Sequence, residues 1–153
     1  MSEIVQILMG FIGSLGFGFL FNLRGKRLVA ASLGGLFAWA LFILLGFLTE
    51  DEPVRYFFVS AAVSLYSEIM ARVMKTPTTS FLNTCLIPLI PGGSLYYTMR
   101  NAFMGTPSDF MDRGIKTLSL AVALALGVIV VTVITEMVKK IQSAKRKAQG
   151  TRQ

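Results

Sequence analysis

The chain has 153 residues, of which 54% are hydrophobic and only 15% are charged, and its mean hydropathy is +0.64. This composition is too apolar for an ordinary soluble domain, so it predicts an integral membrane protein. The chain has no histidine and one cysteine, Cys85, which excludes a disulfide framework, a Cys/His metal site and a histidine-dependent nucleophile within one chain. We therefore expect no metal, no cofactor and no enzymatic activity.

Five apolar runs follow one another, each near the roughly 20 residues that a helix needs to cross the hydrocarbon core. They cover residues 4–23, 28–48, 54–71, 81–103 and 115–138. The connectors are short, and no linker or low-complexity segment divides the chain. The sequence predicts an all-α membrane protein with five transmembrane helices in one domain, residues 1–140, followed by a basic cytoplasmic tail, residues 141–153.

Basic residues are distributed unevenly between the two sides of such a bundle. With five crossings and the amino terminus outside, eleven of the fifteen Lys and Arg residues face the cytoplasm. Cytoplasmic connectors carry this excess in membrane proteins, so we expect a multi-pass protein of the cell (inner) membrane with its C-terminus in the cytoplasm. Six of the eleven lie between Lys139 and Arg152. This tail is expected to touch anionic lipid and not nucleic acid, since no aromatic–basic platform accompanies it.

Small residues recur at four-residue spacing in three of the runs, where they would let helices approach closely in lipid. Simple bundle packing is the ordinary interpretation of such stripes, and close contact between moving elements is the alternative. The three stripes are Gly10, Ser14 and Gly18; Ala30, Gly34 and Ala38; and Ser119, Ala123 and Gly127.

The third run carries a polar stripe in which Ser60, Ser64, Glu68 and Arg72 follow at four-residue spacing. An exposed charge in hydrocarbon costs at least about 2.5–3.5 kcal/mol, so the stripe should face the bundle interior or a partner. Glu68 and Arg72, one turn apart, can form a structural ion pair. Alternatively, Glu68 titrates in a proton-coupled cycle, or Arg72 attracts a carboxylated substrate at a cytoplasmic entry.

The fourth run contains two prolines and two glycines at its centre: Pro88, Pro91, Gly92 and Gly93. Each proline lacks an N–H, so the carbonyls four residues earlier lose their helical partners. One interpretation is a broken helix whose second half points its amides and positive dipole end at an anionic solute. The other is a kinked helix whose free groups are relieved by neighbouring helices.

Hydroxyl and amide groups surround this interruption, and they are suited to hydrogen-bonding a small polar solute. Together with the prolines and glycines they form the predicted substrate site. Its residues are Asn83, Thr84, Pro88, Pro91, Gly92, Gly93, Ser94 and Tyr96.

The stretch from Ser67 to Tyr97 resembles the threonine/serine exporter family. The resemblance rests on SEIMAR over 67–72, KTPTT over 75–79, and IPLIPGG over 87–93 followed by two tyrosines. The chain is most similar to the short form that corresponds to the C-terminal half of the fused exporter. This resemblance implies an inner-membrane exporter of threonine, serine or a succinate-like dicarboxylate, working with a larger membrane subunit of the same family.

Two functions from different classes fit these observations. The first is the small subunit of a secondary exporter of small carboxylated metabolites, in which Glu68 and Arg72 act in coupling or gating. The second is a non-transporting assembly or scaffold subunit, in which the prolines shape a docking groove and the polar stripe joins helices.

Overall fold

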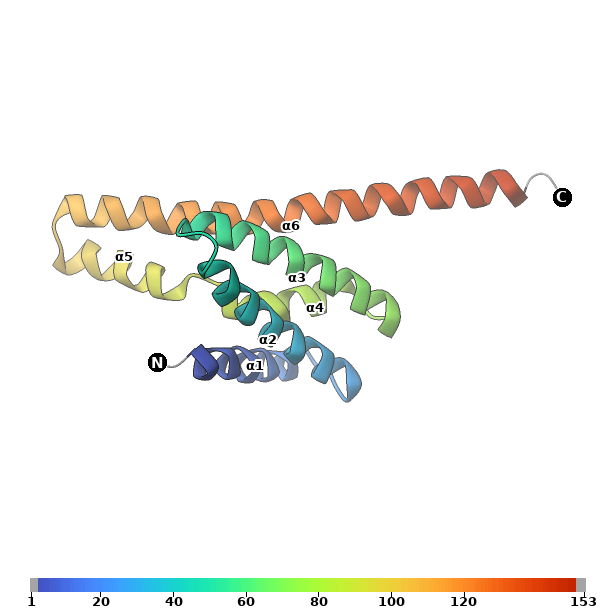
Figure 1. The fold of residues 1–153 in the computed structure, drawn as a ribbon, viewed down its shortest axis with the longest axis horizontal. Coiled ribbons are helices and arrows are strands. Elements are labelled where there is room, and N and C mark those ends of the chain that lie inside the picture. The colour runs from blue at the N-terminus through green and yellow to red at the C-terminus, as the bar shows by residue number, and fades with distance from the viewer. Residues whose placement is uncertain (1–2, 151–153) are drawn as a thin grey trace.

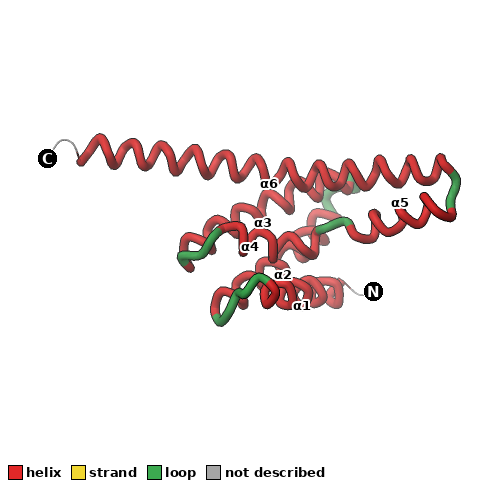
Figure 2. The backbone as a smooth tube through the Cα atoms, turned by 180° about the vertical axis from the view of Figure 1, so that it is seen from behind, coloured by secondary structure: helices red, strands yellow, loops and turns green. Residues whose placement is uncertain are grey.

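The computed structural model describes residues 3–150, with the side chains of all but Gln142 and residues 144–150. Over this range helices alternate with short connectors, as Figures 1 and 2 show. This architecture confirms the all-α class. The elements in chain order are α1 (Glu3–Leu20), α2 (Lys26–Gly46), α3 (Glu52–Met74), α4 (Thr78–Leu86), the 3₁₀ helix η1 (Ile87–Leu89), α5 (Gly92–Met104) and α6 (Pro107–Gly150).

Four of the described helices are long and apolar enough to cross a membrane: α1, α2, α3 and the Pro107–Ile141 part of α6. The expected fourth crossing is divided among α4, η1 and α5, which have 9, 3 and 13 residues. None of these pieces reaches the roughly 20 residues that one spanning helix needs. A multi-pass membrane protein with an interrupted segment is therefore confirmed, whereas the count of five crossings is not, because the prolines divide one of them.

Helices α3 and α6 run parallel, and ion pairs join them at both ends of their contact. Glu52 lies 3.0 Å from Lys116 at one end, and Glu68 lies 3.0 Å from Lys139 at the other. Between these two pairs the helix backbones come close, because a Cβ at Gly127 of α6 would overlap the Ser60 hydroxyl of α3.

The interrupted segment α4–η1–α5 runs between the same two ends of the α3–α6 contact. Thr78, in the first turn of α4, donates a hydrogen bond to Glu68 (3.3 Å), whereas Thr98 of α5 shares one with Thr117 of α6 (2.9 Å), next to Lys116. In Figure 1, α4 and α5 accordingly follow each other from the α3 C-terminal side toward the start of α6.

The connector after α3 sets the starting point of α4. Lys75 adopts the left-handed conformation (φ 50°), and the N–H of Thr76 reaches back to the Ala71 carbonyl (3.0 Å). This is a common helix C-terminal arrangement, which stops α3 and reverses the chain. On the same side, Arg27 at the start of α2 donates to the Met74 carbonyl (3.3 Å), so the first and third connectors lie together.

The small-residue stripes of α1 and α2 form the packed centre of the bundle. All six residues of these two stripes are buried: Gly10, Ser14, Gly18, Ala30, Gly34 and Ala38. A Cβ at Gly34 would overlap the sulfur of Cys85 on α4, and Cys85 itself is fully buried. The stripes therefore act as packing surfaces, and Cys85 is a packing residue.

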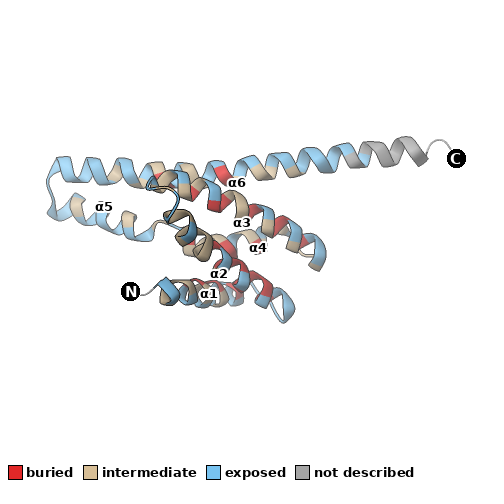
Figure 3. Cartoon of the chain, in the orientation of Figure 1, coloured by how far each residue is buried: buried red, intermediate tan, exposed pale blue. Residues whose placement is uncertain are grey.

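Figure 3 shows that burial is concentrated in α2, α3 and α4, while α5 and the first turns of α6 are exposed over most of their length. The exposed side chains of α5 include large apolar ones, among them Phe103 (82% exposed) and Met104 (83%). A membrane protein covers such a surface with lipid or with another subunit. The side chains of Lys145, Arg146 and Lys147, and all of Arg152, lie outside the described part, so the lipid contact expected of the tail stays a prediction, as does the domain division at residue 140.

Candidate functional site

The helix is broken between η1 and α5. Ile90 takes an extended conformation (φ −60°, ψ 125°), Pro91 follows with ψ 56°, and α5 begins at Gly92. Figure 2 shows the break as a short loop segment between α4 and α5. Since neither proline of the motif has an N–H, the ordinary helical bonds to the carbonyls of Thr84 and Ile87 cannot form.

Both of these carbonyls find other donors inside the protein. The hydroxyl of Ser14 on α1 donates to the Thr84 carbonyl across a fully buried contact of 2.9 Å, and the amide of Ile90 donates to the Ile87 carbonyl at 3.2 Å. Ser14 fits there because Gly35 of α2 has no side chain, since a Cβ at Gly35 would overlap the Ser14 hydroxyl. For the Thr84 carbonyl, relief by a neighbouring helix is thus the right interpretation, whereas the Ile87 carbonyl is satisfied within its own segment.

At the start of α5, after the break, only some of the backbone amides have hydrogen-bond partners. The Gly92 amide bonds the Ile90 carbonyl (2.7 Å), and the Leu95 amide bonds the Pro91 carbonyl (3.0 Å). Between them, the amides of Gly93 and Ser94 have no hydrogen-bond partner among residues 3–150. Unpaired amides at a helix start carry a partial positive charge, so this end of α5 can accept an anion.

The predicted site residues divide into two groups. Thr84 is fully buried and its hydroxyl donates to the Ser80 carbonyl (2.8 Å), so it serves the α4 backbone. Asn83, Gly92, Gly93 and Tyr96 are exposed, and open space surrounds the Cα of each glycine.

Pro88, Pro91 and Ser94 are half-buried and lie between these groups. The break therefore opens toward the outside of this chain and is not enclosed by it.

A small cavity of about 250 Å³ lies beside the break on the side of α1 and α2. It is mainly apolar, and Pro88 forms one wall together with Gln6 and Trp39, which are joined by a hydrogen bond of 3.4 Å. This volume is below the roughly 300–1,000 Å³ of ordinary ligand pockets. The walls from α1 and α2 were not foreseen from the sequence, where no motif marks them.

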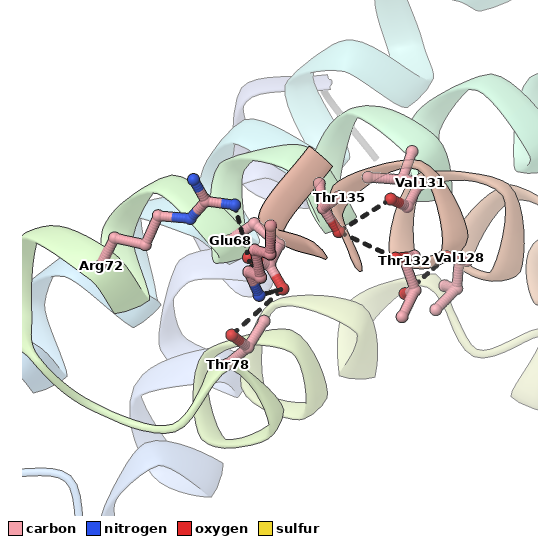
Figure 4. A network of polar contacts seen from close by, with 8 residues as sticks. Glu68, Arg72, Thr78, Val128, Val131, Thr132 and Thr135 are labelled. Carbon is pink, nitrogen blue, oxygen red and sulfur yellow. Dashed lines mark hydrogen bonds and ion pairs between the residues drawn. The ribbon is translucent and has the colours of Figure 1, made fainter. Parts of the chain in front are cut away.

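Glu68 is the centre of a second polar site (Figure 4). Its side chain is only 8% exposed. Its carboxylate accepts hydrogen bonds from Lys139 of α6 (3.0 and 3.2 Å) and from Thr78 of α4 (3.3 Å) and pairs with Arg72 at 3.5 Å. One carboxylate thus connects α3, α4 and α6. The Glu68–Arg72 ion pair inferred from spacing is present, although it is longer than the pair with Lys139.

Sequence reasoning missed Lys139 as a partner of Glu68, because it assigned this lysine to the basic tail. Lys139 directly follows the last apolar run, whose predicted end was residue 138, and α6 continues without interruption past it. Only the parallel packing of α6 on α3 brings the lysine to the carboxylate. Ser67, beside Glu68, is fully buried, and its hydroxyl has no partner within the described chain.

The chemistry of both sites is that of binding and charge pairing. Within residues 3–150, no three His, Cys, Asp or Glu side chains come together in a way that would hold a metal ion.

A comparison with protein families gives one match. The family described as Threonine/Serine exporter, ThrE, matches residues 6–134, which include both the break and Glu68. No curated protein and no solved structure matches the chain.

Proposed function

This chain belongs to the threonine/serine exporter family, and we propose that it is the small membrane subunit of a secondary exporter of small carboxylated metabolites. Membership of this family makes it a transport protein and not an enzyme. The substrates proposed are threonine, serine or a succinate-like dicarboxylate. The observation that carries the proposal is the pair of unpaired amides at Gly93 and Ser94, where α5 begins inside the apolar part of the chain.

A substrate carboxylate suits this position. Its two oxygens can accept hydrogen bonds from the two amides, and the dipole of α5 favours negative charge there. Such half-helix ends bind anionic groups of substrates in other transporters with broken helices. Ser94 is half-buried beside these amides, so its hydroxyl is available as a third donor.

The partner is proposed to be a larger membrane subunit of the same family, which would complete this site. The break is open to the outside of the chain, and its glycines have free space on that side. Asn83 is also exposed, on α4. A carboxamide without a partner in hydrocarbon is costly, so a facing subunit should supply polar groups to Asn83 and the remaining walls of the site.

The proposed topology has five crossings, with the amino terminus outside and the C-terminus in the cytoplasm. The fourth crossing would consist of two half-helices, α4 with η1 and α5, which together connect the Glu68 end of α3 to its Glu52 end. Labelling with a membrane-impermeant maleimide tests this arrangement. Ser108→Cys should react from outside intact cells and Ser143→Cys should not, while the buried Cys85 leaves a low background. The opposite labelling pattern would show that the topology is inverted relative to this proposal.

Glu68 and Arg72 are the proposed coupling or gating residues. A single carboxylate that connects three helices is suited to this role, because removing its charge would break the ion pair between α3 and α6. Glu68→Gln keeps the size of the side chain and its contact with Thr78 but removes the negative charge. We expect export by this variant to lose its dependence on the pH gradient. If the dependence is retained, Glu68 is a structural residue only.

A scaffold subunit is the second candidate, and one observation favours it. The Thr84 carbonyl at the break is already satisfied by Ser14, so part of the motif serves packing. Gly92→Leu separates the two functions, because the added side chain would enter open space in this chain and should leave its fold intact. In an exporter the variant should abolish flux and leave the complex with the larger subunit largely formed; in a scaffold it should abolish the complex.

The proposal itself is tested by export from cells that carry the chain with and without the larger subunit. We expect intracellular threonine, serine or dicarboxylate to fall only when both subunits are present. Unchanged intracellular levels of all three metabolites in both strains would contradict the proposed transport function.

A further inference from the structure

A groove between α2 and α3 lies at the end of the bundle where the first and third connectors meet. Its volume is about 530 Å³, and its lining is almost entirely apolar. Two stripes form its walls: Lys26, Val29 and Leu33 on α2, and Tyr66, Met70 and Met74 on α3. Neither the family nor the exporter hypothesis accounts for this groove.

Specific contacts between α2 and α3 fix the shape of this groove. The Tyr66 hydroxyl donates to the Ala30 carbonyl (2.7 Å), and the Tyr66 ring stacks on Phe37 at 6.0 Å between centroids. At the open end, the guanidinium of Arg27 is bonded to the Met74 carbonyl. These contacts hold the two helices at a fixed separation, so the space between their outer stripes has a defined shape.

The dimensions of the groove suit one acyl chain. From Lys26 to Leu33 the groove runs about 10 Å along α2, at 1.5 Å per residue. One leaflet contributes about half of the roughly 30 Å hydrocarbon core, so the groove lies within a single leaflet. Val29 and Leu33 are 54% and 48% exposed in this chain, and the apolar lining offers no polar partner to water.

The rim of the groove is cationic. Lys26 is exposed at its end and, unlike Arg27 and Arg24, has no hydrogen-bond or ion-pair partner among the described residues. The connector from Asn22 to Arg27 contains three basic residues and no acidic one. Lys75 in the adjoining connector adds a further positive charge. A negative group is therefore the complement of this rim.

We propose that this groove binds an anionic phospholipid, with one acyl chain between the two stripes and the headgroup phosphate at Lys26. The site is distinct from the basic tail and does not depend on the transport function, since it needs only the membrane and the α2–α3 pair. Binding of the lipid would join α2 to α3 along their open edge and so stabilise the bundle.

Native mass spectrometry of the full-length protein in detergent tests the site. The protein is titrated with phosphatidylglycerol or with phosphatidylcholine of the same acyl chains. We expect a first phosphatidylglycerol to bind at least fivefold more tightly than phosphatidylcholine, because one lysine near an anionic headgroup contributes this much. Lys26→Ser should remove about this preference, whereas Arg24→Ser, which removes one positive charge from the same connector but not from the groove, should change it little.

A second pair of variants tests the acyl chain. Leu33→Trp fills the groove, whereas Leu44→Trp places the same side chain on an exposed part of α2 outside it. Only Leu33→Trp should weaken lipid binding. Equal effects within either pair of variants, equal affinity for the two lipids, or displacement of the lipid by soluble glycerol 3-phosphate would overturn the proposal.

Discussion

The hydrogen bond from Ser14 to the Thr84 carbonyl predicts a specific energetic dependence between α1 and the proline motif. The bond is fully buried and 2.9 Å long, and it supplies the donor that Pro88 lacks. Ser14→Ala would leave this carbonyl without a partner in an apolar interior. We expect the free energy of unfolding to fall by about 1–3 kcal/mol, the cost of an unsatisfied buried acceptor.

Ser32→Ala is the matched control. Ser32 is equally buried, and its hydroxyl also donates to a carbonyl at 2.9 Å, that of Leu28 one turn earlier in the same helix. That carbonyl keeps its ordinary helical donor, the Ser32 amide, when the hydroxyl is removed. The free energy of unfolding of this control should therefore fall by only about 0.5 kcal/mol, the low end of the net contribution of one hydrogen bond.

The decisive variant is Pro88→Ala, which returns an N–H to the position from which a helical bond to Thr84 can form. In this background Ser14→Ala should cost little, so a double-mutant cycle should give a coupling energy of about 1–3 kcal/mol, as found for residues in direct contact. The assay is reversible unfolding in bicelles followed by circular dichroism. Equal costs for Ser14→Ala and Ser32→Ala, or no coupling with Pro88→Ala, would refute the reasoning.

Two further predictions concern the contact between α3 and α6. Lys139→Met should lower the free energy of unfolding by about 1–3 kcal/mol. This value lies between those for exposed and buried ion pairs, because Lys139 is 46% exposed whereas the Glu68 carboxylate, which would lose this partner, is buried. Lys140→Met, at the next and exposed position, should change stability little in the same unfolding assay, and equal losses would contradict the role of Lys139. Gly127→Leu should prevent close approach of α6 to Ser60 and lower the yield of folded protein in size-exclusion chromatography, whereas Gly16→Leu, in open space on α1, should not.

Several properties follow from local chemistry and were therefore predictable before the fold was known. The apolar composition and the lengths of the runs identify a helical membrane protein. Pro88 and Pro91 interrupt the hydrogen bonding of a helix interior, because a residue without an N–H cannot continue the bonding ladder. The spacing of Glu68 and Arg72 is likewise sufficient for an ion pair, since residues four apart always share one helix face.

Tertiary structure decided which groups complete these local features. Ser14 reaches the Thr84 carbonyl from 70 residues away, and Lys139 reaches Glu68 from 71 residues away. Nothing in the spacing of either pair indicates the contact, because it depends on which helices pack together and at what height. The same holds for the direction of the break: the prolines predict free amides, but only the packing of α4 and α5 leaves Gly93 and Ser94 open toward the outside of the chain, where a partner subunit would have to complete the site.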